Sequence, residues 1–192
     1  MRNHESNAQK HWICNEFLEW CEDQPAKDIV WIAGNHDFGA ESTFFESYFN
    51  GRAPDYIHYL MDDSVEVQGK SIYGSPWTPN LSSWAFYAKD TAWHWIGDNI
   101  PGGTDFLVLH SPPSGLMLDG GHPNWASPYI LTEITNRVLP ELCVFGHIHE
   151  GYGEIKVKGV TFANVAYCDE FYDPIQQPKV YETTKEGLVC VQ

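Results

Sequence analysis

The chain has 192 residues, of which 43% are hydrophobic and 19% charged, and its formal net charge is −15. This composition is typical of a globular protein with a large core and excludes a disordered chain, so we expect one domain over 1–192. The negative charge would repel nucleic-acid phosphates and anionic membrane surfaces, so neither a nucleic-acid polymer nor a membrane is an expected partner.

The cysteines and the N-terminus favour a cytoplasmic protein. The cysteine count is odd, no CxxC or zinc-finger spacing occurs, and the N-terminus is polar and lacks a secretory signal. No apolar run approaches the length of a transmembrane helix. We therefore expect reduced thiols at all five positions, which are Cys14, Cys21, Cys143, Cys168 and Cys190.

Apolar periodicity predicts the following elements in chain order. Helices are expected at 3–22, 41–49, 90–98 and 129–139, with Pro128 near the start of the last and with Trp93 and either Ile96 or Gly97 facing inward. Buried strands are expected at 29–33, 106–109 and 142–145, and further strands at 65–67, 71–73, 154–157, 160–166, 179–182 and 188–191. Residues 74–79 are expected to be irregular because they contain two prolines, and the glycine-rich segment 114–126 is expected to be a long loop.

Each of the three buried strands runs into a residue that commonly binds metal ions. Asn35, His110 and His147 follow these strands in turn, and His149 lies on the same side of extended chain as His147. The carboxyl ends of strands in α/β folds share one edge, so we expect these side chains to meet in one polar centre. Neutral imidazole is the commonest metal ligand near pH 7, which predicts a metal site there.

These residues also carry a family resemblance. Gly34-Asn35-His36-Asp37, then His110, then Gly146-His147-Ile148-His149 resemble the GNHD, lone-His and GHxH motifs of the calcineurin-like metallophosphoesterases. Segments 72–79 and 146–153 are similar to the small metallophosphoesterase-domain branch, which includes proteins acting on cyclic nucleotides. The resemblance implies an α/β fold, the four-layer α/β/β/α sandwich, with two metal ions at the strand ends.

The resemblance further implies a role for each residue. Asn35, His110 and His147 would bind one metal ion, and His149 would help to bind the other. His36 would be the general acid or charge stabiliser at the leaving oxygen, with Asp37 orienting its ring. Two such ions clamp the oxygens of an in-line displacement and acidify a bridging water, and mixed nitrogen and oxygen ligands fit Mn, Fe or Zn. The implied substrate is a small phosphoester, of the phosphodiester or cyclic-nucleotide kind.

The chain departs from the family pattern at its N-terminus. The family begins with a strand carrying Asp-x-His and continues with Gly-Asp-x-x-Asp, and neither motif occurs here. We expect that Met1 is an internal methionine of a longer protein, with a natural short form as the alternative. Without the acidic ligands we expect fewer than two metal ions, weak metal binding and slow hydrolysis. The loss of the first strand and its loop would leave an apolar sheet edge through which copies associate.

Three readings remain open at this point: a phosphoesterase, a catalytically inactive binding or scaffold protein of the same fold, and a module that binds one metal ion through Asn35, His110 and His147. These three alternatives predict about two, no and one bound metal ion per chain, respectively. For other candidates a structural role is preferred, although Trp125 deserves a test for stacking on a nucleobase. These weaker candidates are His122, Asn164, Trp77, Trp84, Trp93 and Trp125.

Overall fold

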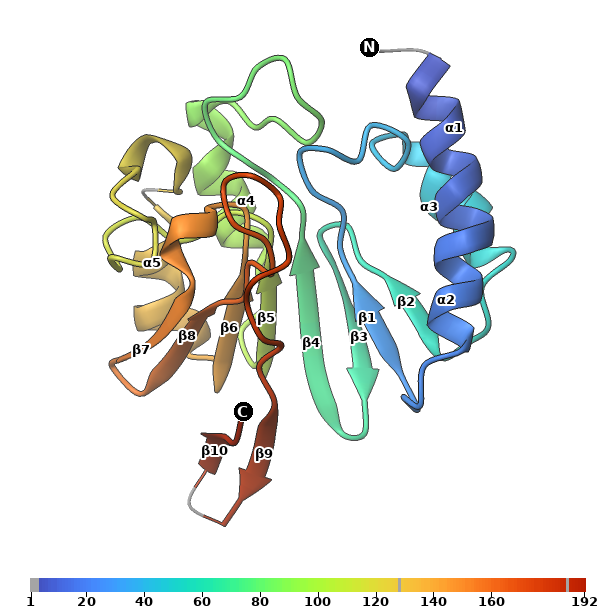
Figure 1. The fold of residues 1–192 in the computed structure, drawn as a ribbon. Coiled ribbons are helices and arrows are strands. Elements are labelled where there is room, and N and C mark those ends of the chain that lie inside the picture. Colours follow the sequence, from blue (N-terminus) through green and yellow to red (C-terminus); the bar gives the residue numbers. More distant parts are fainter. Residues whose placement is uncertain (1–3, 128, 186) are drawn as a thin grey trace.

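The computed structural model describes residues 4–127, 129–185 and 187–192 (Figure 1). The α-helices are α1 (His4–Trp12), α2 (Leu18–Glu22), α3 (Thr43–Asn50), α4 (Trp93–Asn99) and α5 (Ile130–Glu133). The strands are β1 (Ile29–Trp31), β2 (Ile57–Tyr59), β3 (Asp63–Val67), β4 (Lys70–Ser75), β5 (Phe106–Leu109), β6 (Leu142–Phe145), β7 (Gly153–Val157), β8 (Val160–Asn164), β9 (Tyr181–Thr184) and β10 (Gly187–Cys190).

Two of the expected long helices contain a π-helical segment. Ile13–Phe17 joins α1 to α2, and Ile134–Val138 continues α5. The sequence pattern predicted that both segments are helical. It did not predict the π-helical turns, because the spacing of apolar residues was compared with the α-helical repeat alone. The expected first residue of the N-terminal helix and Pro128 lie outside the described residues.

The central sheet has six strands in the order β3-β4-β5-β6-β8-β7. Strands β4, β5, β6 and β8 run parallel to their neighbours, whereas β3 and β7 pair antiparallel at the two edges. Strands β1 and β2 form a separate two-stranded parallel sheet. Strands β9 and β10 form a hairpin that protrudes from the body (Figure 1).

Two apolar clusters show how the layers are arranged. One cluster packs α4 and α5 against the six-stranded sheet, with Trp93, Ile96, Leu107 and Phe162 fully or almost fully buried. The other packs α1 to α3 against the β1–β2 sheet. The two sheets therefore lie between outer helices (Figure 1), and the expected α/β/β/α arrangement is confirmed.

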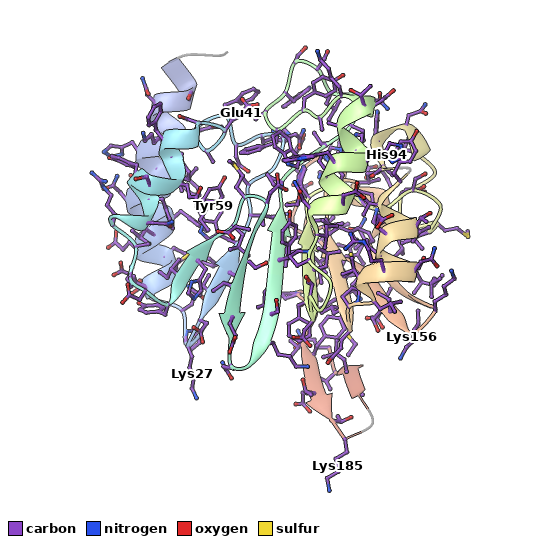
Figure 2. The ribbon with its side chains drawn as sticks, turned by 180° about the vertical axis from the view of Figure 1, so that it is seen from behind. Lys27, Glu41, Tyr59, His94, Lys156 and Lys185 are labelled. Carbon is purple, nitrogen blue, oxygen red and sulfur yellow. The ribbon has the colours of Figure 1, made fainter. Side chains whose placement is uncertain are left out.

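The two sheets approach each other closely at Gly74 of β4. A β-carbon at this position would lie 2.6 Å from the side chains of Ile32 and Leu60, so no larger residue fits without moving a layer. Figure 2 shows Tyr59 within the body, whereas Lys27, Lys156 and Lys185 project from its periphery. This is the usual distribution in globular proteins, in which aromatic side chains are mostly buried and lysine side chains are mostly exposed to solvent.

Several expected boundaries were wrong. Strand β2 was missed because Ile57-His58-Tyr59 is short and lies among turn residues, although its pairing with β1 buries Ile57 and Tyr59. The segment expected to be irregular from residue 74 onward begins as strand, since β4 continues through Ser75. The expected hairpin is confirmed, with both turn residues, Gln68 and Gly69, at positive φ as a tight strand connection requires.

Candidate functional site

A pocket of about 280 Å³ lies where β1, β5 and β6 end. It brings together five of the six residues that the sequence singled out for chemistry, although these strands belong to two different sheets. Its lining is Asn35, His36, Leu81, Trp84, His110, Trp125, His147, His149 and Tyr172. The prediction that these strand ends share one polar centre is confirmed as a matter of geometry.

Asn35 and His110 form the tightest contact in the pocket. Nε2 of His110 lies 2.8 Å from Oδ1 of Asn35 and 3.2 Å from the backbone nitrogen of the same residue. One ring nitrogen cannot accept from the backbone N–H and donate to the amide oxygen at once. When Nε2 accepts from the backbone N–H, its single lone pair is engaged, so a cation beside the amide oxygen would have to displace this hydrogen bond in order to bind Nε2.

His147 and His149 are held by neighbours on other segments. The His147 ring centroid lies 4.8 Å from that of His110, and its Nε2 lies 3.3 Å from the hydroxyl oxygen of the buried Thr78. His147 has φ of 66°, a conformation that non-glycine residues adopt at some cost and that often marks functional sites. Nδ1 of His149 donates to the carbonyl oxygen of Asp169, which leaves Nε2 as its free ligand atom.

The pocket keeps His110 and His147 neutral. Burial, and then the nearby His147 and His36, lower the pKa of His110 from 6.5 to about 3. Burial, and then His149 and His36, lower the pKa of His147 to about 4. Both rings therefore carry no charge at pH 7 and have a lone pair available for a metal ion.

These shifts predict a loss of stability in acid for the metal-free protein. Below pH 6.5 the unfolded chain takes up protons at His110 and His147, whereas the folded chain does not until the pH is far lower. Each histidine then costs about 1.4 kcal/mol per pH unit, so lowering the pH from 7.5 to 5.5 should reduce the free energy of unfolding by about 3 kcal/mol. Urea denaturation at the two pH values measures this.

A matched pair of variants assigns the effect. His110→Asn should remove about half of the acid-induced loss, because one of the two titrating groups is gone. His11→Gln should leave it unchanged, since His11 is exposed on the N-terminal helix. Equal losses in the wild type and in His110→Asn would contradict the assignment.

His36 and Asp37 occupy different environments. The His36 ring is exposed at the pocket mouth, with its centroid 4.6 Å from that of Trp84 and its Nε2 3.5 Å from the hydroxyl oxygen of Tyr172. Asp37 accepts a 2.7 Å hydrogen bond from the backbone N–H of Gly34, and burial raises the pKa of its carboxyl group. Asp37 therefore stabilises the turn, and the expectation that it orients the His36 ring stays a prediction, since the contacts of that ring are with Trp84 and Tyr172.

The donor atoms fit one cation better than two. Asn35 supplies an amide oxygen and His110 and His147 supply neutral nitrogens, which are suitable ligand types. However, no carboxylate lines the pocket, and among the described residues no three His, Cys, Asp or Glu side chains converge as metal ligands do. The residues fit a single, weakly held ion and do not fit a complete two-metal centre.

The sequence did not single out Leu81, Thr78 or Tyr172. Tyr172 reaches the pocket from a segment with no regular structure, and no local signal in the sequence could have placed it there. Of the weaker candidates, Trp84 and Trp125 line the pocket. Asn164 is fully buried and donates to the carbonyl oxygens of Leu118 and Ile148, and His122 stacks on Trp125 outside the lining.

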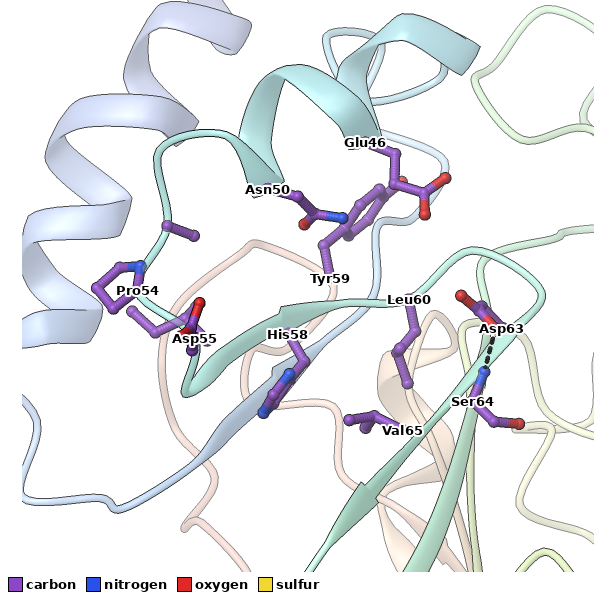
Figure 3. Close-up of a pocket in the computed structure, with 12 residues that line it drawn as sticks. Glu46, Asn50, Pro54, Asp55, His58, Tyr59, Leu60, Asp63, Ser64 and Val65 are labelled. Atoms are coloured by element: carbon purple, nitrogen blue, oxygen red, sulfur yellow. Dashed lines mark hydrogen bonds between the residues drawn. The ribbon is translucent and has the colours of Figure 1, made fainter.

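A second hollow of about 260 Å³ lies between β2 and β3 (Figure 3). Its acidic side chains are Glu46, Asp55 and Asp63, and they come from separate walls of the hollow and do not converge. Asp63 accepts a hydrogen bond from the backbone N–H of Ser64. This hollow therefore lacks the convergent ligands of a metal site.

The fold and the histidine-rich pocket define an α/β/β/α sandwich protein with its site at the strand ends. The sequence pattern described as calcineurin-like phosphoesterase matches residues 6–151. The chain belongs to this family.

Relatives agree with this assignment. Metallophosphoesterase domain-containing protein 1 of Homo sapiens is 31% identical over 196 residues, which cover 87% of this chain and 58% of that protein. UPF0046 protein T07D4.2 of Caenorhabditis elegans is 36% identical over 130 residues, which cover 65% of this chain and 32% of its own. A solved crystal structure with 18% identity matches with a TM-score of 0.62 over 85% of this chain and 68% of its own, which shows likeness of fold.

The chain thus spans 58% of the length of its human relative. No helix in the described ranges combines the length and apolar character that crossing a bilayer requires.

Proposed function

We propose that the pocket binds and hydrolyses a small phosphodiester, with one divalent cation held by Asn35, His110 and His147. The single observation that supports this most strongly is the convergence of an amide oxygen and neutral imidazoles from three strand ends on one pocket. A bound divalent cation supplies Lewis-acid polarisation of the phosphoryl group. Manganese, iron and zinc all suit these ligands, and we propose manganese as the first to test.

The chain's own residues would supply proton transfer and orientation. His36 is exposed at the mouth, so its ring can reach a leaving oxygen and donate a proton to it. Trp84 and Tyr172 contact this ring and restrict its orientation. His149 is fixed by its bond to Asp169, with Nε2 left to contact a phosphoryl oxygen or a second, weaker cation.

The mouth of the pocket favours a substrate with a flat group. Trp84 is 40% exposed, Trp125 is 42% exposed and Tyr172 is 62% exposed, and all three line the pocket. Exposed aromatic faces stack on nucleobases with little dependence on sequence. We therefore propose a nucleotide, and in particular a cyclic nucleotide, as the substrate class.

The same geometry supports slow turnover. A carboxylate ligand would offset the charge of a dication, and none lines this pocket. We expect metal binding to be weak and the rate to be well below that of a complete two-metal phosphoesterase. The alternative, a binding or scaffold protein of the same fold, would bind the ligand without metal-dependent turnover.

His36→Gln gives the sharpest test of the proposed reaction. For cyclic AMP, whose leaving alkoxide needs a proton, we expect kcat with Mn²⁺ to fall about 10²- to 10⁴-fold. For bis-p-nitrophenyl phosphate the loss should be much smaller, because nitrophenolate leaves without protonation. Steady-state rates on both substrates measure the difference.

His94→Gln serves as the control, since His94 is exposed and packs on Tyr129 away from the pocket. Its rates should match those of the wild type. Equal losses for both substrates in His36→Gln would exclude proton donation by this residue. No turnover of either substrate by the wild type at saturating Mn²⁺ would favour the binding-protein alternative.

We also propose a cytoplasmic location. All five cysteines lie within the described ranges and are free thiols. A reducing compartment keeps such thiols unpaired.

A further inference from the structure

Trp125 lies on a loop, residues 112–127, whose two ends meet. The backbone N–H of Ser114 donates to the carbonyl oxygen of Ser127 over 2.8 Å, and the N–H of Ser127 donates to that of Pro112 over 3.0 Å. The loop therefore leaves the body of the protein and returns to it at one point, as compact Ω-loops do. Trp125 reaches the pocket from this loop and forms part of its lining.

Contacts inside the loop and against its neighbours fix its conformation. The buried carboxylate of Asp119 accepts a 3.1 Å hydrogen bond from the backbone N–H of Gly121. A β-carbon at Gly120 would lie 2.9 Å from the side chain of Ile148, so the loop packs directly on the segment that carries the last two pocket histidines. Trp125 therefore stands on a preorganised support, which lowers the entropic cost of binding a ligand to it.

The indole of Trp125 has one aromatic neighbour among the described residues. The ring of His122 packs nearly parallel to it, with ring centroids 4.5 Å apart and planes inclined by 22°. A ring stacked in this way covers one face of the indole. Because Trp125 is nevertheless 42% exposed and lines the pocket, its other face is available to a flat ligand.

The other two aromatic residues at the pocket mouth have different neighbours. The ring of Trp84 packs on His36, with the centroids 4.6 Å apart. The ring of Tyr172 meets His36 and His149 at steep angles, with centroid distances of 5.9 and 5.4 Å. A base stacked on either ring would compete with the contacts that orient these histidines. In the described part of the chain, Trp125 makes no ring contact with either histidine.

We propose that Trp125, backed by His122, is the platform on which the base of a nucleotide stacks, and that it determines the preference of the pocket for nucleotides over other phosphoesters. This inference rests on the proposed function, because it takes the phosphate to lie at the pocket histidines and the base to lie at the mouth. Stacking depends little on the identity of the base. The pocket should therefore recognise the presence of a base and discriminate little among different bases.

Calorimetric titration with AMP and with ribose 5-phosphate, both in the presence of Mn²⁺, tests the proposal, because the two ligands differ only in the base. The wild type should bind AMP about 5- to 150-fold more tightly, the range that stacking of one base on an aromatic ring provides. Trp125→Ala should lose this preference and bind ribose 5-phosphate as before. Trp125→Phe should retain most of it, because the phenyl ring still offers a face.

Trp95→Ala is the matched control, since Trp95 is 58% exposed on α4 and does not line the pocket. Its affinities for both ligands should equal those of the wild type. A folded Trp125→Ala variant that still prefers AMP would overturn the proposal. A wild type that binds the two ligands equally, or binds neither, would overturn it as well.

Turnover of cyclic AMP with Mn²⁺, measured on the same preparations, separates this inference from the proposed reaction. A wild type that prefers AMP through Trp125 but shows no turnover would uphold base recognition and exclude hydrolysis of this substrate. Turnover by a wild type without any preference for AMP would uphold the hydrolysis and overturn the role of Trp125.

Discussion

Gly34→Ala is expected to lower the affinity for Mn²⁺ and the turnover of a phosphodiester at least 10- to 100-fold, since an ångström-scale displacement in a site costs about this much. A β-carbon at residue 34 would lie 2.4 Å from Cε1 of His110 and 2.5 Å from its Nδ1. The ring would have to move away, and its contact with Asn35 would be lost. Calorimetric titration with Mn²⁺ and steady-state rates measure the effect.

Gly102→Ala is the matched control. A β-carbon there meets no heavy atom within 4 Å, so Mn²⁺ affinity and turnover should equal those of the wild type. Circular dichroism should show that both variants fold. Unchanged Mn²⁺ affinity in folded Gly34→Ala would mean that His110 is not a ligand.

Phe162→Ala is expected to cost about 3 to 5 kcal/mol of the free energy of unfolding, the range found when a buried aromatic residue is truncated. Phe162 is fully buried in the cluster between β8 and the helices. Small proteins are stable by only about 5 to 15 kcal/mol, so this change removes a large share. Urea denaturation at constant pH gives the value.

Ile155→Ala tests the same pair of strands without opening the core. Ile155 lies opposite Phe162 in the β7–β8 ladder, but it is 39% exposed. We expect a loss of about 1 kcal/mol or less. Similar losses in both variants would contradict the assignment of Phe162 to the core.

The sequence predicted the strand ends better than the walls of the pocket. Asn35, His110 and His147 were recognisable because each follows an apolar run. The shared edge of parallel strands accounts for His110 and His147, since β5 and β6 are neighbours in one sheet, whereas β1 brings Asn35 from the other sheet. Tyr172 was not recognisable, because its position depends on how an irregular segment folds back across the molecule. The interpretation of 1–192 as a single domain stays a prediction.

The sequence did not determine the hydrogen-bond partners of two polar side chains, Asp37 and Asn164. Asp37 belongs to a motif that suggests chemistry, yet its carboxylate bonds to the backbone of Gly34. Asn164 stands at a strand end like the pocket residues, yet it is fully buried and satisfies backbone carbonyls. A residue type and its place in a strand do not determine which way its side chain turns.

The pocket lies on the seam between two separately packed halves. Asn35 follows Ala33 of the cluster beneath α1 to α3, whereas His110 follows Leu109 of the cluster beneath α4 and α5. Trp77 packs against both clusters and bridges them. An ion bound by both Asn35 and His110 would link the two halves. It would therefore stabilise their association without changing the packing inside either apolar cluster.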